Sequence, residues 1–445
     1  MLEAIEVFHR GVAHQEKNDL DLAVAAFSEA IQIDPKYVEA YYSRGNAYEA
    51  QGQHDRAIVD YEAVLQFSPN EPAAYYNRGV ALANQGHRTQ AIADFDEAIR
   101  LDPKYAKAYY NRGLAHQKMG QLDQALADFT KVISLEPDEA DARVGRGLAR
   151  LQKGDYDAAI ADFSEAVRIK PDCAEAYGNR GNAFEGKGDY ETAIADYGQV
   201  IRLQPKDTKA YCNRAVALFN LGRFNQAIAD YTEAIRIRPK LARPYYSRGL
   251  AYAKNGQTDQ AIADFTTAIR LEPKNVDPYI ARGLARAAQG DHPGAIEDYT
   301  AALGIDPKCA KAHYHRGIAY SSQGDLDQAV ADYTAVLQIY PKDAKAYCHR
   351  GVVRTRQGNV AAALADYDEA IRLDPRYAHA YYNRGLVHRI QGDLDKAIAD
   401  FTETVRLQPK NARAYHNRAL AYEKKGPKAK AEADHATVKR LEGSG

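Results

Sequence analysis

Apolar and small residues recur along this chain at spacings of three and four, in pairs of segments separated by a short break. Within residues 38–71, one such segment spans about 40–51 and a second spans about 55–68. This spacing is typical of amphipathic α-helices. Gly52 can end the first helix because glycine readily adopts a left-handed conformation, and Pro69 ends the second because a residue before proline is pushed out of helical space. The pattern predicts a helical hairpin.

The hairpin recurs with a fixed period of 34 residues, marked by prolines from Pro35 to Pro409. Numbering each unit from position 1 at Ala4 gives thirteen repeats without an insertion, and we expect them to form a single domain over residues 4–445. The repeats begin at residues 4, 38, 72, 106, 140, 174, 208, 242, 276, 310, 344, 378 and 412.

Three positions of the repeat predict the core between its helices. Position 20 is Ala in all thirteen repeats, position 8 is Gly except at Ala215 and Ala419, and position 24 is Phe or Tyr in repeats one to twelve. Small residues on facing helices allow close approach of the backbones. We expect the position-24 ring to pack beside them.

In repeat two, the residues of this signature are Tyr41, Gly45, Tyr48, Ala57, Tyr61 and Pro69. Their order resembles the tetratricopeptide repeat, and the signature recurs in phase over essentially the whole chain. The resemblance implies an all-α fold, a right-handed superhelix of thirteen helix-turn-helix repeats. Two positions depart from the family's pattern, because Tyr usually replaces its Trp and Arg replaces its Leu before the Gly.

That arginine, at position 7, occurs in all thirteen repeats, and position 23 is Asp in twelve of them. An antiparallel hairpin places the two positions side by side, which predicts an ion pair within each repeat. Repeat one has Ala26 at position 23, so this pairing leaves Arg10 without a partner. The alternative is a row of arginines that binds phosphates, but a neighbouring carboxylate largely neutralises each one.

The last helix carries polar residues, Glu432, His435 and Lys439, where other repeats have core residues. We interpret repeat thirteen as a polar cap of the stack. The residues 443–445 that follow have the composition of a flexible tail.

Composition excludes several other classes of function. The net charge of -1 gives no overall field for nucleic acid or membrane, and no apolar run reaches the length of a membrane span. Four widely spaced cysteines indicate a reduced, cytoplasmic protein. Equivalent histidines on neighbouring helices, His315 and His349, are expected to be too far apart to share a metal. Neither a catalytic set nor a cofactor motif remains, so we predict a non-enzymatic protein without cofactors.

The resemblance implies that the first helix of each repeat lines a concave groove where ligands bind. Position 6, on this side, carries a partial row of asparagines, which is similar to the asparagine row in the repeat region of O-GlcNAc transferase. Carboxamides can hold an extended peptide by its backbone, although Asn is also a common residue on solvated helix faces. The six are Asn77, Asn111, Asn179, Asn213, Asn383 and Asn417.

Position 5, beside the asparagines, often carries tyrosine, which suits protein interfaces but can also pack between adjacent helices. These residues are Tyr42, Tyr76, Tyr110, Tyr246, Tyr314 and Tyr382.

Charge on the groove positions differs between the two halves of the chain. Repeats one to six carry mainly acids, which are Glu16, Glu39, Glu49, Asp141, Glu175 and Glu185. Repeats seven to thirteen carry mainly bases, which are Lys209, Arg243, Lys254, Lys311, Lys345, Arg356, Arg389, Arg413 and Lys424. We expect an acidic ligand segment along repeats seven to thirteen, although random scatter of charge is the alternative.

These patterns predict a protein-interaction scaffold whose partners are proteins or peptides and which acts as a monomer, with end-to-end stacking left open. Two alternatives remain. One is an RNA-binding solenoid that uses the basic half, with the tyrosines stacking on bases. The other is a structural spacer whose groove stays empty.

Overall fold

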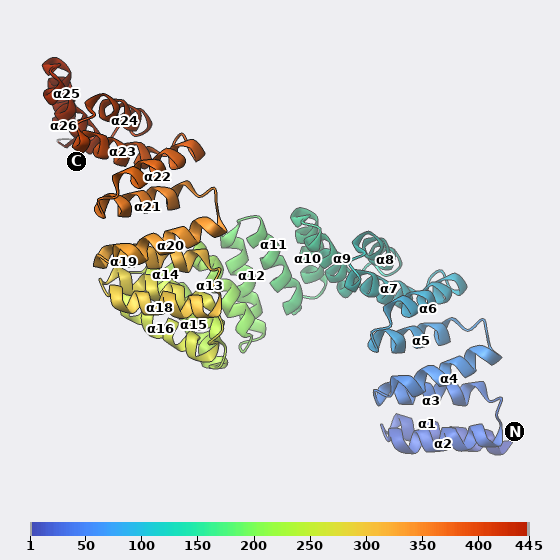
Figure 1. The fold of residues 1–445 in the computed structure, drawn as a ribbon. Helices are drawn as coiled ribbons and strands as arrows, with labels where there is room; N and C mark the ends of the chain where they lie inside the picture. The colour runs from blue at the N-terminus through green and yellow to red at the C-terminus, as the bar shows by residue number, and fades with distance from the viewer. Residues whose placement is uncertain (1, 443–445) are drawn as a thin grey trace. The chain divides into compact units, whose positions relative to one another are not determined.

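The computed structural model describes residues 2–442, and all the regular structure in this range is α-helical. The chain divides by its internal contacts into two units, one ending at Arg223 and the other beginning at Phe224. Within each unit, helices that follow one another in the chain pack side by side, as Figure 1 shows for α3 and α4. The all-α prediction is confirmed.

The first helices of the thirteen repeats are α1 (Leu2–Glu16), α3 (Val38–Ala50), α5 (Pro72–Asn84), α7 (Ala106–Lys118), α9 (Ala140–Gln152), α11 (Ala174–Gly186), α13 (Thr208–Asn220), α15 (Ala242–Lys254), α17 (Val276–Ala288), α19 (Ala310–Gln323), α21 (Ala344–Arg356), α23 (Ala378–Gln391) and α25 (Ala412–Lys425). The second helices are α2 (Leu20–Ile33), α4 (His54–Phe67), α6 (Arg88–Leu101), α8 (Leu122–Leu135), α10 (Tyr156–Ile169), α12 (Tyr190–Leu203), α14 (Phe224–Ile237), α16 (Thr258–Leu271), α18 (His292–Ile305), α20 (Leu326–Ile339), α22 (Val360–Leu373), α24 (Leu394–Leu407) and α26 (Lys428–Glu442).

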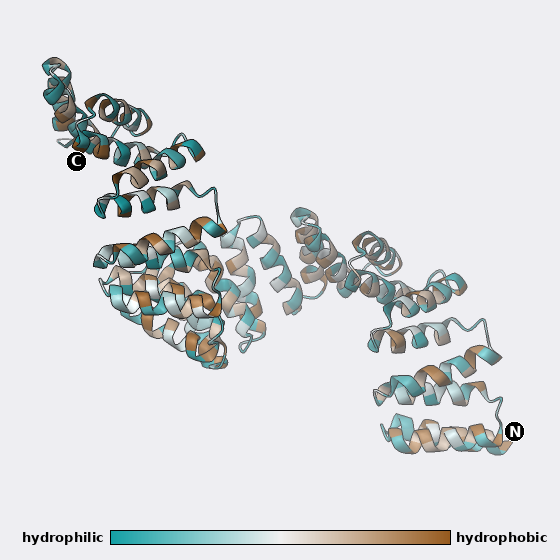
Figure 2. Ribbon diagram, viewed as in Figure 1, coloured by the Kyte–Doolittle hydropathy of each residue, from teal (hydrophilic) through white to brown (hydrophobic). Residues whose placement is uncertain are grey.

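The helix boundaries and turns follow the sequence pattern to within two residues. In repeat two, α3 and α4 span 38–50 and 54–67, against the expected 40–51 and 55–68. The turn residue Gly52 has a φ of 72°, and Asn18 takes the same conformation in repeat one with a φ of 61°. Figure 2 shows the stripes of hydrophobic residues that the helices carry.

In repeats one to twelve the position-24 ring is buried in the core, as expected. Ala295 and Tyr299 of α18 are buried. A Cβ atom added to Gly283 of α17 would lie 2.6 Å from Cε1 of Tyr299, so the helices can approach this closely only because position 8 has almost no side chain. None of the described helices is both long enough and apolar enough to span a membrane.

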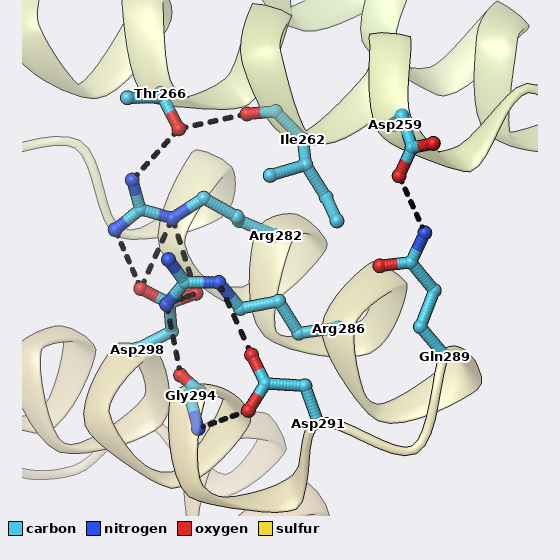
Figure 3. Close-up of polar contacts among 9 residues, drawn as sticks. All are labelled: Asp259, Ile262, Thr266, Arg282, Arg286, Gln289, Asp291, Gly294 and Asp298. Atoms are coloured by element: carbon cyan, nitrogen blue, oxygen red, sulfur yellow. Dashed lines mark hydrogen bonds and ion pairs between the residues drawn. The ribbon is translucent and has the colours of Figure 1, made fainter.

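In most repeats a buried aspartate joins the two helices, as repeat nine shows (Figure 3). Asp298 of α18 is only 2% exposed. Arg282 of α17 donates to it through Nε at 3.1 Å and through Nη2 at 2.6 Å. The pairing within repeats that the sequence predicts is thus confirmed, and we call it the Arg–Asp clamp. The other described pairs are Arg44–Asp60, Arg78–Asp94, Arg112–Asp128, Arg146–Asp162, Arg180–Asp196, Arg248–Asp264, Arg316–Asp332, Arg350–Asp366, Arg384–Asp400 and Arg418–Asp434.

The same arginine also reaches the preceding repeat, which the sequence analysis missed. Nη1 of Arg282 donates to the hydroxyl of Thr266 on α16 at 2.9 Å, and this hydroxyl donates to the carbonyl of Ile262 at 2.7 Å. Position 25 supplies this acceptor as Ser, Thr or Asp in many repeats, for example Ser28 for Arg44 and Asp368 for Arg384. One guanidinium therefore fixes both the hairpin and the contact between repeats.

Repeat one needs a correction, because Arg10 is not left without a partner. It forms an ion pair with Glu29, which lies three residues beyond Ala26 on α2. Half of each of these two side chains is exposed, so this pair is a surface substitute for the buried clamp.

The polar residues of the last helix lie where water can reach them. Glu432 and Lys439 are exposed on α26, and Nε2 of His435 lies 2.9 Å from Glu423 Oε1. The tail predicted at residues 443–445 lies outside the described residues.

Removing one buried carboxylate should loosen the repeat that contains it. We expect Asp298→Ala to destabilise repeat nine by about 3–5 kcal/mol, because it leaves the guanidinium of Arg282 buried without its charge partner. Hydrogen–deuterium exchange should become faster in α17 and α18. As a control, Asp259→Ala removes an exposed carboxylate that accepts from Gln289 at 2.7 Å, and it should leave exchange in α17 and α18 unchanged. Equal exchange in both variants would contradict the clamp's role.

Replacing a turn glycine by alanine should lower the stability of the fold, whereas replacing a helical glycine by alanine should raise it. Gly290 has a φ of 85°, so Gly290→Ala should cost about 1 kcal/mol of unfolding free energy. A Cβ added to Gly304 of α18 meets nothing within 4 Å, so Gly304→Ala should stabilise by up to about 1 kcal/mol. Thermal unfolding of the two variants would measure this difference in sign.

Candidate peptide-binding face

The first helices lie on the inner side of the curvature within each unit. Contacts between next-but-one helices join first helices to one another, for example α7 to α9 and α17 to α19. Elements that still touch across an intervening helix lie on the more tightly curved side. Groove positions on the first helices therefore gather on one surface in each unit, which we call the first-helix face.

The asparagines and tyrosines on this face contact each other between successive repeats. Asn77 Nδ2 on α5 donates to the hydroxyl of Tyr42 on α3 at 2.9 Å. The same bond joins Asn111 to Tyr76 at 3.0 Å and Asn417 to Tyr382 at 3.2 Å. We call this contact the Asn–Tyr bridge. It links position 6 of one repeat to position 5 of the repeat before it.

The tyrosine rings of the bridge also pack on the core. The ring of Tyr42 meets that of Tyr61 with centroids 6.1 Å apart. These tyrosines are half-buried, so they contribute both to the packing within the repeat and to the face. Five further rings at position 5 pack in the same way, in the pairs Tyr76–Phe95, Tyr110–Phe129, Tyr246–Phe265, Tyr314–Tyr333 and Tyr382–Phe401.

The bridge uses the donors of the asparagines and leaves their acceptors. Asn111 Nδ2 also donates to the carbonyl of Lys107 at 3.0 Å, and Asn417 Nδ2 to that of Arg413 at 2.8 Å. Each amide nitrogen has only two hydrogens. The group left for a ligand on Asn77 and Asn111 is Oδ1, which can accept a hydrogen bond from a peptide N–H, whereas Asn417 is buried.

Three of the predicted asparagines have other surroundings because their preceding repeat lacks the tyrosine. Asn383 Nδ2 lies 3.7 Å from Sγ of Cys348, and Asn213 Nδ2 donates to Oδ1 of Asn182 at 3.2 Å. Asn179 follows a repeat with Val144 at position 5, and residues 2–442 supply it with no side-chain hydrogen bond. The six asparagines are therefore not equivalent.

Most of the predicted basic residues are exposed. This holds for Lys209 on α13 and, in the second unit, for Lys311 and Lys345. Their ammonium groups form no ion pair within the described part of the chain. The other exposed bases of this set are Arg243, Lys254, Arg356, Arg413 and Lys424.

Two of the basic residues are less available to a ligand than the rest, one because of its hydrogen bonds and the other because of its burial. Arg356 Nη1 donates to the carbonyl of Ser321 at 2.7 Å and to its hydroxyl at 2.8 Å. Arg389 is half-buried, and its Nε has no hydrogen-bond partner in residues 2–442. We therefore expect the freely exposed lysines to dominate any attraction of acidic ligands.

The acids of the first six repeats divide in a similar way. Glu16, Glu39 and Glu175 are exposed. Glu49 accepts from Asn84 at 2.7 Å, and Glu185 Oε2 lies 2.8 Å from the hydroxyl of Tyr197. The last two carboxylates are therefore engaged within the fold.

Two of the pockets that open on this face have room for a ligand side chain, and the sequence analysis missed both. One, of about 290 Å³, lies between α11 and α13, where position 5 is Gly178. The other, of about 470 Å³, is mainly apolar and is lined by Leu250, Ile280 and Leu284 together with Lys311. Comparing position 5 down the thirteen repeats would have revealed the first, since Gly178 is the only glycine there.

The two histidines at position 6 of the first-helix face, His315 and His349, pack against neighbouring rings. His315 stacks on Tyr299 and His349 on Tyr333, and burial lowers the pKa of both imidazoles. All four cysteines are free thiols. Among the described residues, no group of three or more His, Cys, Asp or Glu side chains comes together as a metal site would require.

Comparison of the sequence with family profiles agrees with this architecture. The family profile described as "Tetratricopeptide repeat" matches residues 110–174, 246–308, 280–344, 350–412 and 391–437, which together exceed half of the chain. A second profile, described as "TPR repeat", matches residues 11–52, 45–86, 88–120, 186–222 and 217–256. No sequence among curated proteins is significantly similar.

Several solved structures are similar to this chain. The Cut9–Hcn1 hetero-tetramer of APC/C is 15% identical with a TM-score of 0.41, over 98% of this chain and 94% of that one. Yeast Tom70 is 20% identical with a TM-score of 0.39, over 90% and 96%. MamA is 30% identical with a TM-score of 0.35, over 36% and 95%.

The thiol of Cys348 should react unusually slowly with alkylating reagents at pH 8. Burial raises its pKa to about 11, so it remains protonated at pH 8. Its alkylation by iodoacetamide should accelerate about tenfold per pH unit well beyond pH 9, because only the thiolate reacts. Peptide mapping by mass spectrometry, with the half-buried Cys309 as the internal reference, would measure this. A plateau for Cys348 near pH 9 would contradict its burial.

Proposed function

Because this chain belongs to the tetratricopeptide repeat family, we propose that it is a non-enzymatic scaffold that binds extended segments of partner proteins on its first-helix face. The observation that carries the proposal is the pairing of two features there. Among the described residues, exposed lysines offer charge that no ion pair uses, and the Oδ1 atoms of Asn77 and Asn111 offer acceptors. A peptide needs both kinds of contact along its length.

The proposed ligand is acidic where it lies on the second unit. Lys311 and Lys345 occupy position 2 of successive repeats, and Lys254 and Lys424 occupy position 13 of theirs. An acidic segment would gain favourable pairs with these side chains while leaving the Arg–Asp clamps undisturbed. The apolar pocket beside Lys311 would accept an aliphatic side chain next to an acid.

A labelled acidic peptide tests the proposal directly. We expect a fluorescein-labelled 20-residue peptide of alternating Glu and Ser to bind, and its Lys and Ser counterpart not to bind. Lys311→Glu combined with Lys345→Glu should weaken binding about tenfold, because two exposed attractions become repulsions. Fluorescence anisotropy would measure both affinities.

The matched control reverses charge on the turns instead of on the first-helix face. Lys274 and Lys308 are also exposed, and Lys274→Glu with Lys308→Glu makes the same change in net charge. The proposal fails if both double variants lose binding equally. It also fails if a single-stranded oligouridine of 20 nucleotides binds far more tightly than the peptide and with steep salt dependence, since the bases would then form an RNA site.

A further inference from the structure

Repeat six has a gap on the first-helix face where six other repeats place a tyrosine. Its position 5 is Gly178, and the pocket of about 290 Å³ lies above it. The lining includes Tyr197 and Val200 from α12, Asn182 from α11 and Asn213 from α13. The floor is therefore an aromatic ring, and the walls carry carboxamides.

Repeat two shows the same arrangement with the gap filled. Its position-9 residue is Asn46 and its position-24 residue is Tyr61, as Asn182 and Tyr197 are in repeat six. The hydroxyl of Tyr61 donates to Asn46 Oδ1 at 2.8 Å. In repeat six, the hydroxyl of Tyr197 lies 2.9 Å from Asn182 Oδ1.

The asparagine at position 6 of the next repeat, Asn77 or Asn213, also has an equivalent contact in the two cases. Asn77 Nδ2 lies 3.0 Å from Asn46 Oδ1, and Asn213 Nδ2 lies 3.2 Å from Asn182 Oδ1. In repeat two, Asn77 also donates to the phenol of Tyr42, whose ring meets that of Tyr61. Repeat six therefore retains the residues that would contact a phenol, Tyr197 and Asn213, but has Gly178 instead of a tyrosine at position 5.

The filled repeat also shows what the missing ring would cover. A pocket at repeat two reaches Val64 and Ser68, but its lining does not include Asn46, Tyr61 or Asn77. The equivalent three residues do line the pocket of repeat six. Tyr42 therefore occupies the deeper part of the site in repeat two.

We propose that the pocket at Gly178 binds the side chain of a tyrosine from a partner segment, which takes the place of the absent position-5 ring. This inference rests on the proposed peptide-binding function. The bound ring would pack on Tyr197, and its hydroxyl would accept from Nδ2 of Asn213. Asn179, which also lines the pocket, would supply a further polar contact.

The chemistry of the pocket favours an uncharged phenol over other side chains. The hydroxyl of Tyr197 lies 2.8 Å from the carboxylate of Glu185, and Glu175 and Asp207 also line the site. Lys209 is the one basic residue of the lining. Phosphotyrosine or a carboxylate would therefore meet net repulsion. Phenylalanine would fill the space but leave the Asn213 donor without its acceptor.

Two small molecules and two variants separate these possibilities. p-Cresol is the tyrosine side chain alone, and toluene is that of phenylalanine. We expect p-cresol to bind the wild-type chain with saturable NMR shifts at Tyr197 and Asn213, and toluene to bind about fivefold more weakly because it lacks the hydroxyl. Gly178→Tyr should abolish binding there. A Cβ at Gly178 comes no closer than 3.6 Å to Val200 Cγ2, so this variant has room to fold.

The reciprocal variant should gain a binding site for p-cresol. Tyr42→Gly should open a second phenol site in repeat two, with shifts at Tyr61 and Asn77. Binding of p-cresol to Gly178→Tyr at the original residues would overturn the proposal, as would the absence of any shift in the wild type. Thermal unfolding of each variant would establish that it remains folded.

A display library of random 12-residue peptides connects the pocket to protein ligands. Selection on the wild-type chain should enrich tyrosine at one position, and the same selection on Gly178→Tyr should not. If peptides are selected on both chains without tyrosine enrichment, the pocket inference fails while the proposed scaffold function stands. If no peptides are selected on either chain although p-cresol binds, the scaffold function fails instead.

Discussion

The Arg–Asp clamp is the interaction on which the rest of this structure depends. Each aspartate that forms a described clamp is at most 6% exposed, and its charge is tolerated because a guanidinium donates two hydrogen bonds to it, as Arg44 does to Asp60. The third nitrogen of the same group bonds to the preceding repeat in many cases, as Arg248 does to Thr232 at 2.9 Å. The clamp therefore sets both the angle within a hairpin and the step to the next one.

Because these buried groups hold the repeats together, other positions of the first helices can vary. Position 5 can be Tyr, Cys, Ile or Gly without disturbing position 7 or position 23. The Asn–Tyr bridge is an addition to the frame, since repeat six lacks it while its clamp, Arg180–Asp196, has the usual geometry. Differences in binding along the face can thus arise from single residues, such as the pocket at Gly178 and the lysines of the second unit.

The sequence was sufficient to predict the period, the helices, the turns and the pairing within repeats. Regular spacing carried that information, and Gly52 and Pro69 mark the ends of helices for reasons of backbone conformation. The hydrogen bond to position 25 was missed because Ser, Thr or Asp on an exposed helix turn looks like solvated surface. Arg10 was expected to lack a partner because position 23 of its repeat is Ala26, whereas Glu29 lies one turn further along α2. The Asn–Tyr bridge escaped notice because its partners are 35 residues apart. The division between α13 and α14 has no counterpart in the unbroken 34-residue period.

The central claim is that partners bind to the first helices, and photo-crosslinking would test it most directly. A benzophenone amino acid would replace Ser322 on the first helix of repeat ten, or Gln338 on its second helix, both of which are exposed. With a peptide selected for binding, the account predicts a crosslink from position 322 and none from position 338. A crosslink from position 338 alone would place the ligand on the second helices and contradict it.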